Sequence, residues 1–275
     1  MARGRKLEST HDYQKALKNK YGIGEGPEYK PWLEVRDVKS QGIRTQIYGH
    51  KVQRIHHLMS SIETELFYLL EFSDNIIDIR EQFPILPLNL SLRVAKHIGV
   101  EHPIHPKSKE PIVITTDFLA TVKTATGVEY RAFSVKPEGE IKSQRTLEKI
   151  DIERVCWQLL GVQFNLFTGN ALTQTQSKNI SWITSTFRDA PTLFDKEQVN
   201  SALSTLNEGK QVIEDICNRF VAQNIVSVDH ALTLFRYLIA YKYVEVDMAY
   251  AIAESGVVTI DKVHKTLNRA QYGTR

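Results

Sequence analysis

The sequence has few cysteines and no long apolar run, and each absence excludes a class of protein. Its 275 residues contain two cysteines, Cys156 and Cys217, which do not form a CxxC pair. This spacing provides neither a disulfide framework nor a thiolate zinc site, and it is typical of a reducing compartment. Apolar stretches fall short of the roughly 18 residues of a membrane span, and the basic N-terminus lacks the apolar segment of a secretory signal. We therefore expect a soluble, cytoplasmic protein without a membrane contact.

A strong net charge is also absent, but the charge is unevenly distributed along the chain. The whole sequence carries a formal charge of +3. Residues 1–54 contain twelve Lys or Arg and six Asp or Glu, a balance of +6, so the remainder carries −3. A basic leading segment on a nearly neutral body is typical of a phosphate-contacting arm, and a solvated, partly disordered tail is the alternative. The candidate phosphate contacts are Arg3, Arg5, Lys6, Arg44, Lys51 and Arg54.

Apolar periodicity predicts two folded domains after a basic, loop-like arm of residues 1–30. Helices and apolar strands alternate over residues 60–168, and this order indicates a mixed α/β domain at 31–170. Residues 171–275 predict a smaller, mostly helical domain, with the boundary near residues 168–178. The expected elements are strands at 43–49, 75–88, 111–122, 130–137 and 162–168, helices at 60–72 and 143–161, helix-like stretches at 199–224 and 227–244, and a β-prone run at 256–261.

Two of the predicted strands carry a charged residue among apolar neighbours. The stretch TTDFLATVKTATGVEYRAFSVKP, residues 115–137, has Asp117 in its first strand and Lys136 at the end of its second. Side chains alternate between the two faces of a strand, so Ser134 and Lys136 share one face, and hairpin pairing can bring Asp117 to it. A plain ion pair would explain both charges. Partly buried charges are nevertheless costly unless they are paired or used.

A third charged candidate, Glu63, lies on the predicted helix at 60–72. An aspartate, a lysine and a helical glutamate form a pattern that occurs in metal-dependent nucleases. Phosphodiester cleavage needs hard oxygen ligands for Mg²⁺ and a cation beside the phosphate. The same glutamate stands three residues after Ser60, so a capping box at the helix start is the competing interpretation. By spacing alone the pattern is a weak signal, because short motifs recur by chance.

Six sequence blocks, in order between residues 31 and 168, resemble a known family. The blocks are PWLEV, RIHHLMSSIETELFYLLEF, DIREQFPILP, TTDFL, FSVKP and RTLEKIDIERVCW. They are similar to TnsA, the endonuclease subunit of heteromeric cut-and-paste transposons, and the C-terminal third matches only in outline. The catalytic domain of that family is similar to restriction endonucleases of the PD-(D/E)XK class. The resemblance therefore implies a restriction-endonuclease-like mixed sheet flanked by helices, followed by a small winged-helix-like domain.

The resemblance implies a role for each matching position. The first acidic metal ligand falls on Glu63, and the central one falls on Asp117. The charge-stabilising lysine falls on Lys136, and a further glutamate ligand falls on Glu153, for which a solvated helix face is the alternative. Ser134 stands where the family usually has Glu or Gln, and it could offer only a backbone carbonyl or a held water. The expected cofactor is Mg²⁺, with Mn²⁺ as a substitute, and Ser134 leaves the ion preference open.

Other motifs have structural explanations that compete with a site. Adjacent residues point to different faces of a strand or helix, so at least one of His56 and His57 is expected to be structural. The HPIHP stretch at 102–106 resembles a pair of metal ligands, but its prolines favour an exposed loop. Arg80 could contact phosphate or brace the core.

The resemblance also implies a reaction and its partners. The expected reaction is Mg²⁺-dependent nicking of DNA at the 5′ ends of a transposon, while a TnsB-type DDE recombinase cuts the 3′ ends. A TnsC-type ATPase regulator is expected on the C-terminal domain, whose apolar stretch ALTLFRYLIAYKYV, residues 231–244, suits a core helix better than a DNA reader. The basic residues of the arm then become DNA contacts. A stand-alone restriction-like or repair nuclease and a non-catalytic architectural subunit are the alternatives, and Ser134 keeps the latter open.

Overall fold

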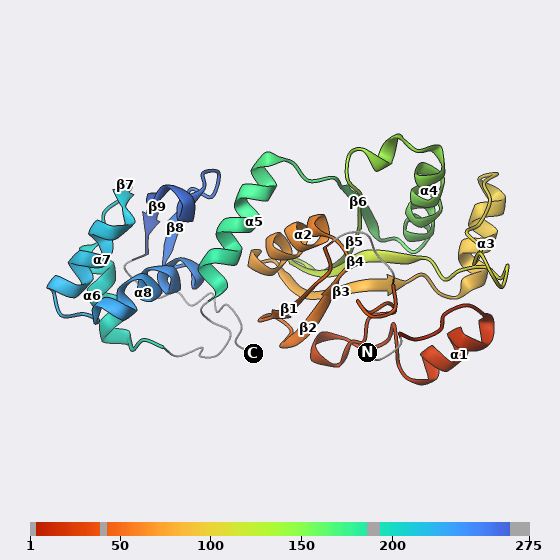
Figure 1. Ribbon diagram of the computed structural model, residues 1–275, viewed down its shortest axis with the longest axis horizontal. Coiled ribbons are helices and arrows are strands. Elements are labelled where there is room, and N and C mark those ends of the chain that lie inside the picture. Colours follow the sequence, from red (N-terminus) through yellow and green to blue (C-terminus); the bar gives the residue numbers. More distant parts are fainter. Residues whose placement is uncertain (1–3, 39–42, 186–192, 265–275) are drawn as a thin grey trace. The chain divides into compact units, whose positions relative to one another are not determined.

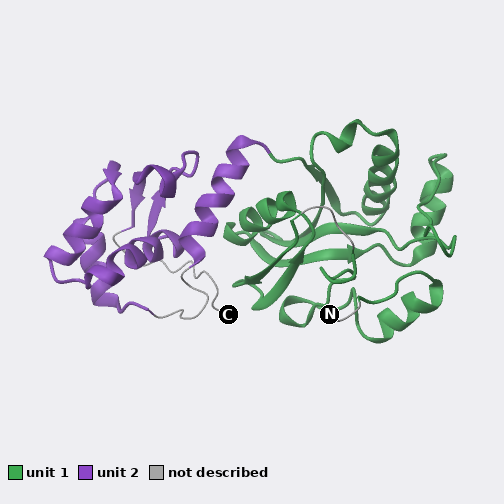
Figure 2. Cartoon of the chain, viewed as in Figure 1, with its two compact units in different colours: residues 1–169 green, residues 170–275 purple. Residues whose placement is uncertain are grey.

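The computed structural model describes residues 4–38, 43–185 and 193–264, and the chain forms two compact units. Residues 1–169 form unit 1 and residues 170–275 form unit 2 (Figure 2). The division falls within the stretch where the change in sequence character placed it. Within the described ranges, no helix combines the length and the apolar character needed to cross a membrane.

Unit 1 has the mixed α/β order of elements that the sequence predicts (Figure 1). The strand predicted at 75–88 ends earlier, at Pro84, and a helix that the sequence did not predict, α3, begins at Leu88. The elements in chain order are α1 (Thr10–Lys18), η1 (Gly26–Glu28), β1 (Thr45–Gly49), β2 (Arg54–Leu58), α2 (Ser61–Phe72), β3 (Ile76–Pro84), α3 (Leu88–His97), β4 (Thr115–Thr124), β5 (Gly127–Val135), η2 (Glu140–Lys142), α4 (Gln144–Leu159) and β6 (Gln163–Phe167).

The central sheet is mixed because its last strand enters through a helical crossover. The strand order is β3-β4-β5-β6, with antiparallel pairing from β3 to β5 and parallel pairing of β5 with β6. Antiparallel neighbours can be joined by a tight turn, as after Thr124, whereas parallel neighbours need a crossover, which α4 supplies. Strands β1 and β2 form a separate hairpin. A mixed sheet flanked by helices fits the restriction-endonuclease-like fold.

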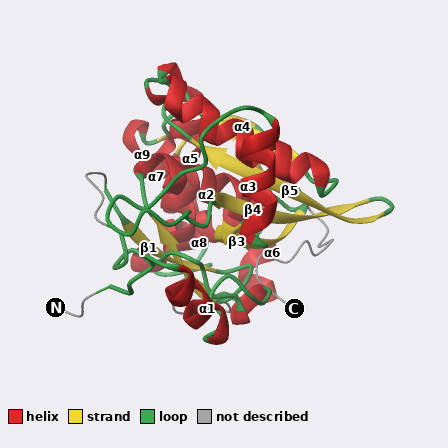
Figure 3. Ribbon diagram, turned by 90° about the vertical axis from the view of Figure 1, so that its right-hand side faces the viewer, coloured by secondary structure: helices red, strands yellow, loops and turns green. Residues whose placement is uncertain are grey.

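Side-chain alternation along β4 divides the core of unit 1 into two layers. Phe118 and Ala120 belong to a cluster that contains Leu66 and Phe67 of α2. Leu119 belongs to a second cluster, which contains residues of α3 and α4. Helices therefore pack against both faces of the sheet, while the exposed tip of the β4–β5 hairpin extends beyond them (Figure 3).

An ionic network is buried where β2 meets β3. The Glu81 carboxylate accepts two hydrogen bonds from Arg54, at 2.5 and 2.8 Å, and lies 2.8 Å from Nδ1 of His56. Burial alone would raise the pKa of Glu81, but His56 and Arg54 hold it well below its usual range. The structure thereby corrects the expectation that Arg54 contacts DNA, because its guanidinium is enclosed and already paired.

The N-terminal segment is a packed part of unit 1, which differs from the loop-like arm expected for residues 1–30. The Ser9 side chain caps the first turn of α1. Tyr13 and Ala16 are buried in a cluster with Trp32. Helix α1 was not predicted from the sequence, because most of its residues are polar and only a narrow apolar stripe contacts the rest of the unit.

Unit 2 combines helices with a three-stranded antiparallel sheet of order β7-β9-β8. The sequence merged two helices into one stretch at 199–224, but a short strand separates them. Helix α6 ends where Leu206 turns to an extended conformation, and Gly209 begins the strand with a φ of +101°, which glycine adopts readily. The elements in chain order are α5 (Ala171–Thr184), α6 (Lys196–Thr205), β7 (Gly209–Val212), α7 (Ile213–Ala222), α8 (Val228–Ala240), β8 (Val244–Val246), α9 (Ile252–Ser255) and β9 (Val257–Val263).

Replacing Arg54 by methionine should destabilise unit 1, because the Glu81 charge would stay buried without its arginine partner. We expect the free energy of unfolding to fall by about 3–5 kcal/mol, as measured by chemical denaturation. The matched control is Arg154→Met, since Arg154 forms an exposed pair with Asp151 and should contribute less than about 1 kcal/mol. Equal losses in the two variants would contradict the structural role of Arg54.

Candidate active site

Asp117 and Lys136 meet at one end of the antiparallel β4–β5 pair. Oδ2 of Asp117 accepts hydrogen bonds from Nζ of Lys136 at 2.9 Å and from the Val135 N–H at 2.6 Å. The Lys136 N–H donates to the carbonyl of Phe167 in β6 at 3.0 Å, which fixes the start of the loop that carries the lysine. The neighbouring parallel strand therefore holds the lysine beside the aspartate.

Glu63 reaches the same region from the first turn of α2. Its carboxylate accepts hydrogen bonds from the Met59 N–H and from the Ser60 hydroxyl, both at 2.9 Å. The capping interaction therefore exists, but it leaves further lone pairs of the carboxylate available. Burial, and next the Asp117 carboxylate, raise the pKa of Glu63 to about 7. The two acidic groups are thus within electrostatic reach of each other.

Glu153 adds a third carboxylate from α4. It is 5% exposed, so it does not lie on a solvated helix face. Burial, and next the charge of Asp117, raise the pKa of Glu153 to about 8. Hydrogen bonding from the Thr116 and Ser134 hydroxyls opposes part of this rise, but Oε1 of Glu153 is buried without a well-formed hydrogen bond among the described residues. Buried polar atoms without a good partner are rare and costly, and an ion or a water would satisfy this oxygen.

Gln82 contacts the site, and sequence reasoning missed it. Its Nε2 lies 3.4 Å from Oε2 of Glu63 and 3.5 Å from Oδ1 of Asp117. Its Oε1 accepts a hydrogen bond from the Thr115 hydroxyl at 3.2 Å. In the sequence it is one of four polar or charged residues in β3, and nothing local distinguishes it from the others. Only the pairing of β3 with β4, which sets it opposite Asp117, reveals the contact.

The donor atoms at the site suit a hard divalent cation. Among the described residues, no three His, Cys, Asp or Glu side chains form a group that could hold a metal ion as they stand. Mg²⁺ in proteins commonly keeps several waters and takes only one or two carboxylates, so Glu63 and Asp117 are sufficient for it. A cation between them would also relieve the repulsion that contributes to the raised pKa of Glu63.

Comparison with known proteins decides the family. The chain is 31% identical over 246 residues to the Transposon Tn7 transposition protein TnsA of Escherichia coli, and the match covers 89% of each protein. The chain belongs to the TnsA family. The family model described as TnsA-like endonuclease N terminal matches residues 73–169, and the one described as TnsA endonuclease C terminal matches residues 173–248. The resemblance inferred from the six sequence blocks is therefore confirmed.

The TnsA matches cover most of the candidate residues. Asp117, Ser134, Lys136 and Glu153 lie within the N-terminal match, which begins after Glu63. The structure supplies the link to Glu63 through Gln82, which faces both carboxylates. These site assignments remain predictions of the TnsA resemblance, now with a defined geometry.

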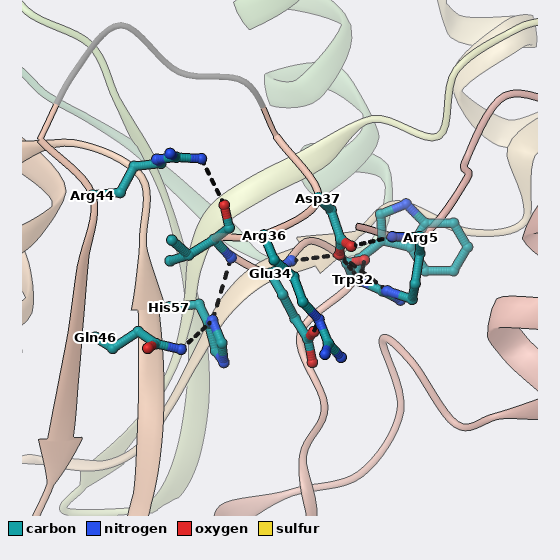
Figure 4. A network of polar contacts seen from close by, with 9 residues as sticks. Arg5, Trp32, Glu34, Arg36, Asp37, Arg44, Gln46 and His57 are labelled. Atoms are coloured by element: carbon teal, nitrogen blue, oxygen red, sulfur yellow. Dashed lines mark hydrogen bonds and ion pairs between the residues drawn. The ribbon is translucent and has the colours of Figure 1, made fainter. Parts of the chain in front are cut away.

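A basic groove lies along the N-terminal segment of this TnsA family member. Its volume is about 470 Å³, and Lys6, Lys15 and Lys30 contribute to its lining. Arg5 also lines it but is already engaged, because it pairs with Asp37 and donates to a backbone carbonyl (Figure 4). Lys6 is exposed, so of these two predicted DNA contacts it is the more available.

The remaining predicted DNA contacts also differ in availability. Arg44 is exposed and donates to the carbonyl of Val35 at 2.8 Å (Figure 4). Lys51 is partly buried and donates to the Ser73 carbonyl at 2.8 Å. Arg3 lies outside the described residues.

The other sequence motifs have structural partners. His56 is buried against Glu81, which agrees with the expectation that at least one residue of the histidine pair is structural. In the HPIHP stretch, Nε2 of His102 lies 2.9 Å from the Ser91 hydroxyl. Arg80 is buried and donates to the Thr121 hydroxyl at 3.0 Å, so it braces the sheet.

Glu153 should make the metal-free protein less stable as the pH rises. Its carboxyl group stays protonated in the folded state up to a pKa of about 8 but ionises near 4.5 in the unfolded chain, so the folded state binds more protons between these values. The resulting stabilisation is complete below a pH of about 4.5 and is lost as the pH rises through about 8. Because one pKa unit corresponds to about 1.4 kcal/mol, Glu153→Gln should gain more than about 1 kcal/mol relative to wild type between about pH 5 and pH 8.5.

Denaturant unfolding in the presence of a chelator, at the two pH values, measures this difference. The control is Asp151→Asn, because Asp151 is an exposed neighbour on the same helix and its effect should change little with pH. A stability gap between Glu153→Gln and wild type that is the same at both pH values would contradict a buried, protonated Glu153.

Proposed function

We propose that this chain is the endonuclease subunit of a heteromeric transposase and that it nicks DNA at transposon ends by Mg²⁺-dependent hydrolysis. The observation that supports this most directly is the approach of three side chains that are remote in the sequence. Nζ of Lys136 lies 2.9 Å from Oδ2 of Asp117, and the Asp117 charge contributes to the raised pKa of Glu63. Membership of the TnsA family, with a relative named as a transposition protein, supports the setting.

Glu63 and Asp117 are the proposed metal ligands. When bound, Mg²⁺ would polarise the scissile phosphate and make a water more acidic. The Met59 N–H and the Ser60 hydroxyl orient Glu63, and the Val135 N–H orients Asp117. Both carboxylates are therefore held by the fold before an ion arrives, which reduces the cost of ordering them.

Lys136 is the proposed charge stabiliser. Burial alone would lower its pKa, but the Asp117 carboxylate raises it overall, so the side chain remains cationic at neutral pH. A cationic ammonium cannot accept a proton, which favours a role in opposing negative charge on the phosphate over a role as a general base.

Glu153 is the proposed additional ligand, and it compensates for the missing acidic side chain at Ser134. Its carboxyl group interacts with the buried Ser134 hydroxyl, and its Oε1 lacks a well-formed hydrogen bond among the described residues. A ligand carboxylate must be deprotonated, so the raised pKa of Glu153 implies that it would release its proton when a cation binds. Mn²⁺ should substitute for Mg²⁺, because both ions accept carboxylate oxygens and waters.

Two protein partners are proposed from the family resemblance. A TnsB-type DDE recombinase would cut the 3′ ends and supply sequence specificity, while this chain would cut the 5′ ends. A TnsC-type ATPase regulator would dock on unit 2. The succession α6, β7, α7, α8, β8, the short helix α9 and β9, with a sheet of order β7-β9-β8, supports a winged-helix-like description of this unit.

Helix α8 supports docking over base reading in unit 2. Every residue from Leu234 to Ala240 is buried, so the C-terminal half of this helix packs in a core. Arg236, a basic residue of that half, donates to the carbonyl of Trp182 and to the Ser185 hydroxyl. A recognition helix presents its polar side chains to a DNA groove. In α8, the Arg236 side chain is instead hydrogen-bonded within unit 2.

DNA is the proposed occupant of the basic groove in unit 1. Its cationic lining complements a phosphate backbone. Two residues beyond Lys30, the Trp32 N–H donates to the carbonyl of Gln82 at 3.2 Å, so this part of the chain runs along β3 close to the candidate active site. A strand held in the groove would therefore pass near the acidic residues.

Asp117→Ala should abolish cleavage of the transposon 5′ ends, by a factor of more than about 100, because it removes the central ligand and the partner of Lys136. In a transposition assay with the partner recombinase and ATPase, the donor would stay attached at its uncut strands. The products should therefore change from simple insertions to fused donor–target molecules, which sequencing of the junctions distinguishes.

The control for this assay is Asp151→Asn, which removes an exposed charge and should leave simple insertions unchanged. Simple insertions at the wild-type level from Asp117→Ala would instead identify a non-catalytic architectural subunit. Cleavage of a defined sequence by the purified wild-type chain alone would identify a stand-alone nuclease.

Charge reversal in the groove should weaken DNA binding in a salt-dependent manner. Lys15 and Lys30 are exposed and line the groove, so the double change Lys15→Glu and Lys30→Glu removes two candidate phosphate-binding side chains. The slope of log affinity against log salt should fall by about one for each phosphate that is no longer neutralised, as measured by fluorescence anisotropy with a transposon-end duplex. Lys196→Glu, an exposed change in unit 2, is the control and should leave the slope unchanged.

A further inference from the structure

Strand β3 changes face at Gln82. Ile79 packs in the core layer that contains α2, whereas Phe83 packs in the layer that contains α3 and α4. In a regular strand, residues an even number apart share one face, so these two side chains should lie together. Gln82 has a φ of +48°, in the left-handed region, and this conformation accounts for the change. Glutamine rarely adopts it, and such residues cluster at functional sites.

The unusual backbone presents the Gln82 amide to two acidic side chains. The residue is 3% exposed, and its Nε2 lies 3.4 Å from Oε2 of Glu63 and 3.5 Å from Oδ1 of Asp117. Ionised carboxylate oxygens can only accept hydrogen bonds, and Oε1 of Gln82 accepts one from the Thr115 hydroxyl at 3.2 Å. These partners therefore fix the orientation of the amide, with its NH2 group toward Glu63 and Asp117 and its oxygen toward Thr115.

Neighbouring contacts hold Gln82 in this conformation. Its carbonyl accepts a hydrogen bond from the Trp32 N–H at 3.2 Å. The residue before it, Glu81, is locked by Arg54 and His56. The strain is therefore maintained from both sides, as expected where the surroundings over-determine a backbone.

We propose that Gln82 is a positioning residue whose amide holds the Glu63 and Asp117 carboxylates at a fixed separation, ready to share one divalent cation. This role rests on the metal-dependent function proposed above. Like charges in a buried site repel each other, and a donor placed between them offsets the repulsion until a cation arrives. Lys136 bonds the other oxygen of Asp117, Oδ2, so the two donors serve different atoms.

Gln82→Met tests the amide, because it retains most of the side-chain volume and removes the donor. Mn²⁺ should bind the full-length, DNA-free protein at least about tenfold more weakly, by isothermal titration calorimetry, as for other residues that orient metal ligands. The matched control is Gln46→Met, the same change at an exposed residue of β1 whose amide lies beside His57 (Figure 4). It should leave the Mn²⁺ affinity within about twofold of wild type.

Gln82→Asn distinguishes the effect of side-chain length from the effect of the left-handed backbone conformation. Asparagine adopts the left-handed region more readily than glutamine, but its shorter side chain cannot bridge both carboxylates. We expect a melting temperature at or above that of wild type, together with a loss of Mn²⁺ affinity like that of Gln82→Met. Retained affinity in Gln82→Asn would show that the residue matters only for the fold.

Asp117→Asn separates this inference from the proposed function. If wild type binds Mn²⁺ and Asp117→Asn does not, while both Gln82 variants bind like wild type, the positioning role is wrong and the metal site stands. If wild type binds no Mn²⁺, or if Asp117→Asn binds it equally well, the metal site itself is wrong and the role of Gln82 falls with it.

Discussion

Burial and the Asp117 carboxylate together set the charge of the ionisable groups at the candidate site. The Asp117 carboxylate contributes to the raised pKa of both Glu63 and Glu153, and it also raises the pKa of Lys136. Charges are poorly screened inside a protein, so one ionised carboxylate keeps nearby acids protonated to higher pH and a nearby lysine charged. Without a cation, the Asp117–Lys136 salt bridge lies beside a Glu153 carboxyl group that stays largely protonated at neutral pH. This arrangement limits the cost of burying several charged groups together.

A second ionic centre supports the strand that borders the site. Glu81 lies one residue before Gln82, and its bonds to Arg54 and His56 attach β3 to β2. Strand β3 therefore contributes to both the candidate active site and this ionic centre. Its Glu81 pairs with the buried Arg54. The next residue, Gln82, faces the Glu63 and Asp117 carboxylates. A buried charge pair contributes little net stability but fixes geometry strongly when both partners are satisfied. The unusual backbone at Gln82 depends on that rigidity.

Local sequence patterns predicted those helices and strands that have a clear apolar face or a recognisable helix cap. Strand alternation predicted β4 and β5, and Ser60 with Glu63 predicted the start of α2. Helix α1 and the short strand β7 were missed, because the first has a narrow apolar stripe and the second is four residues long. Arg54 was misassigned because a lysine-rich and arginine-rich segment resembles a phosphate-binding arm whether or not one of its arginines is buried.

The sequence by itself determined the family, the mixed α/β class of the first domain, and the identity of the acidic and basic residues at the candidate site. These properties reside in residue types and spacings of a few positions, which local periodicity and motif comparison capture. Only the tertiary structure decided which charges are enclosed and which remain available. Arg54 meets Glu81 from 27 residues away, and Gln82 meets Asp117 from 35 residues away. Burial and pairing depend on neighbours brought together by the sheet, so no local pattern could have assigned them.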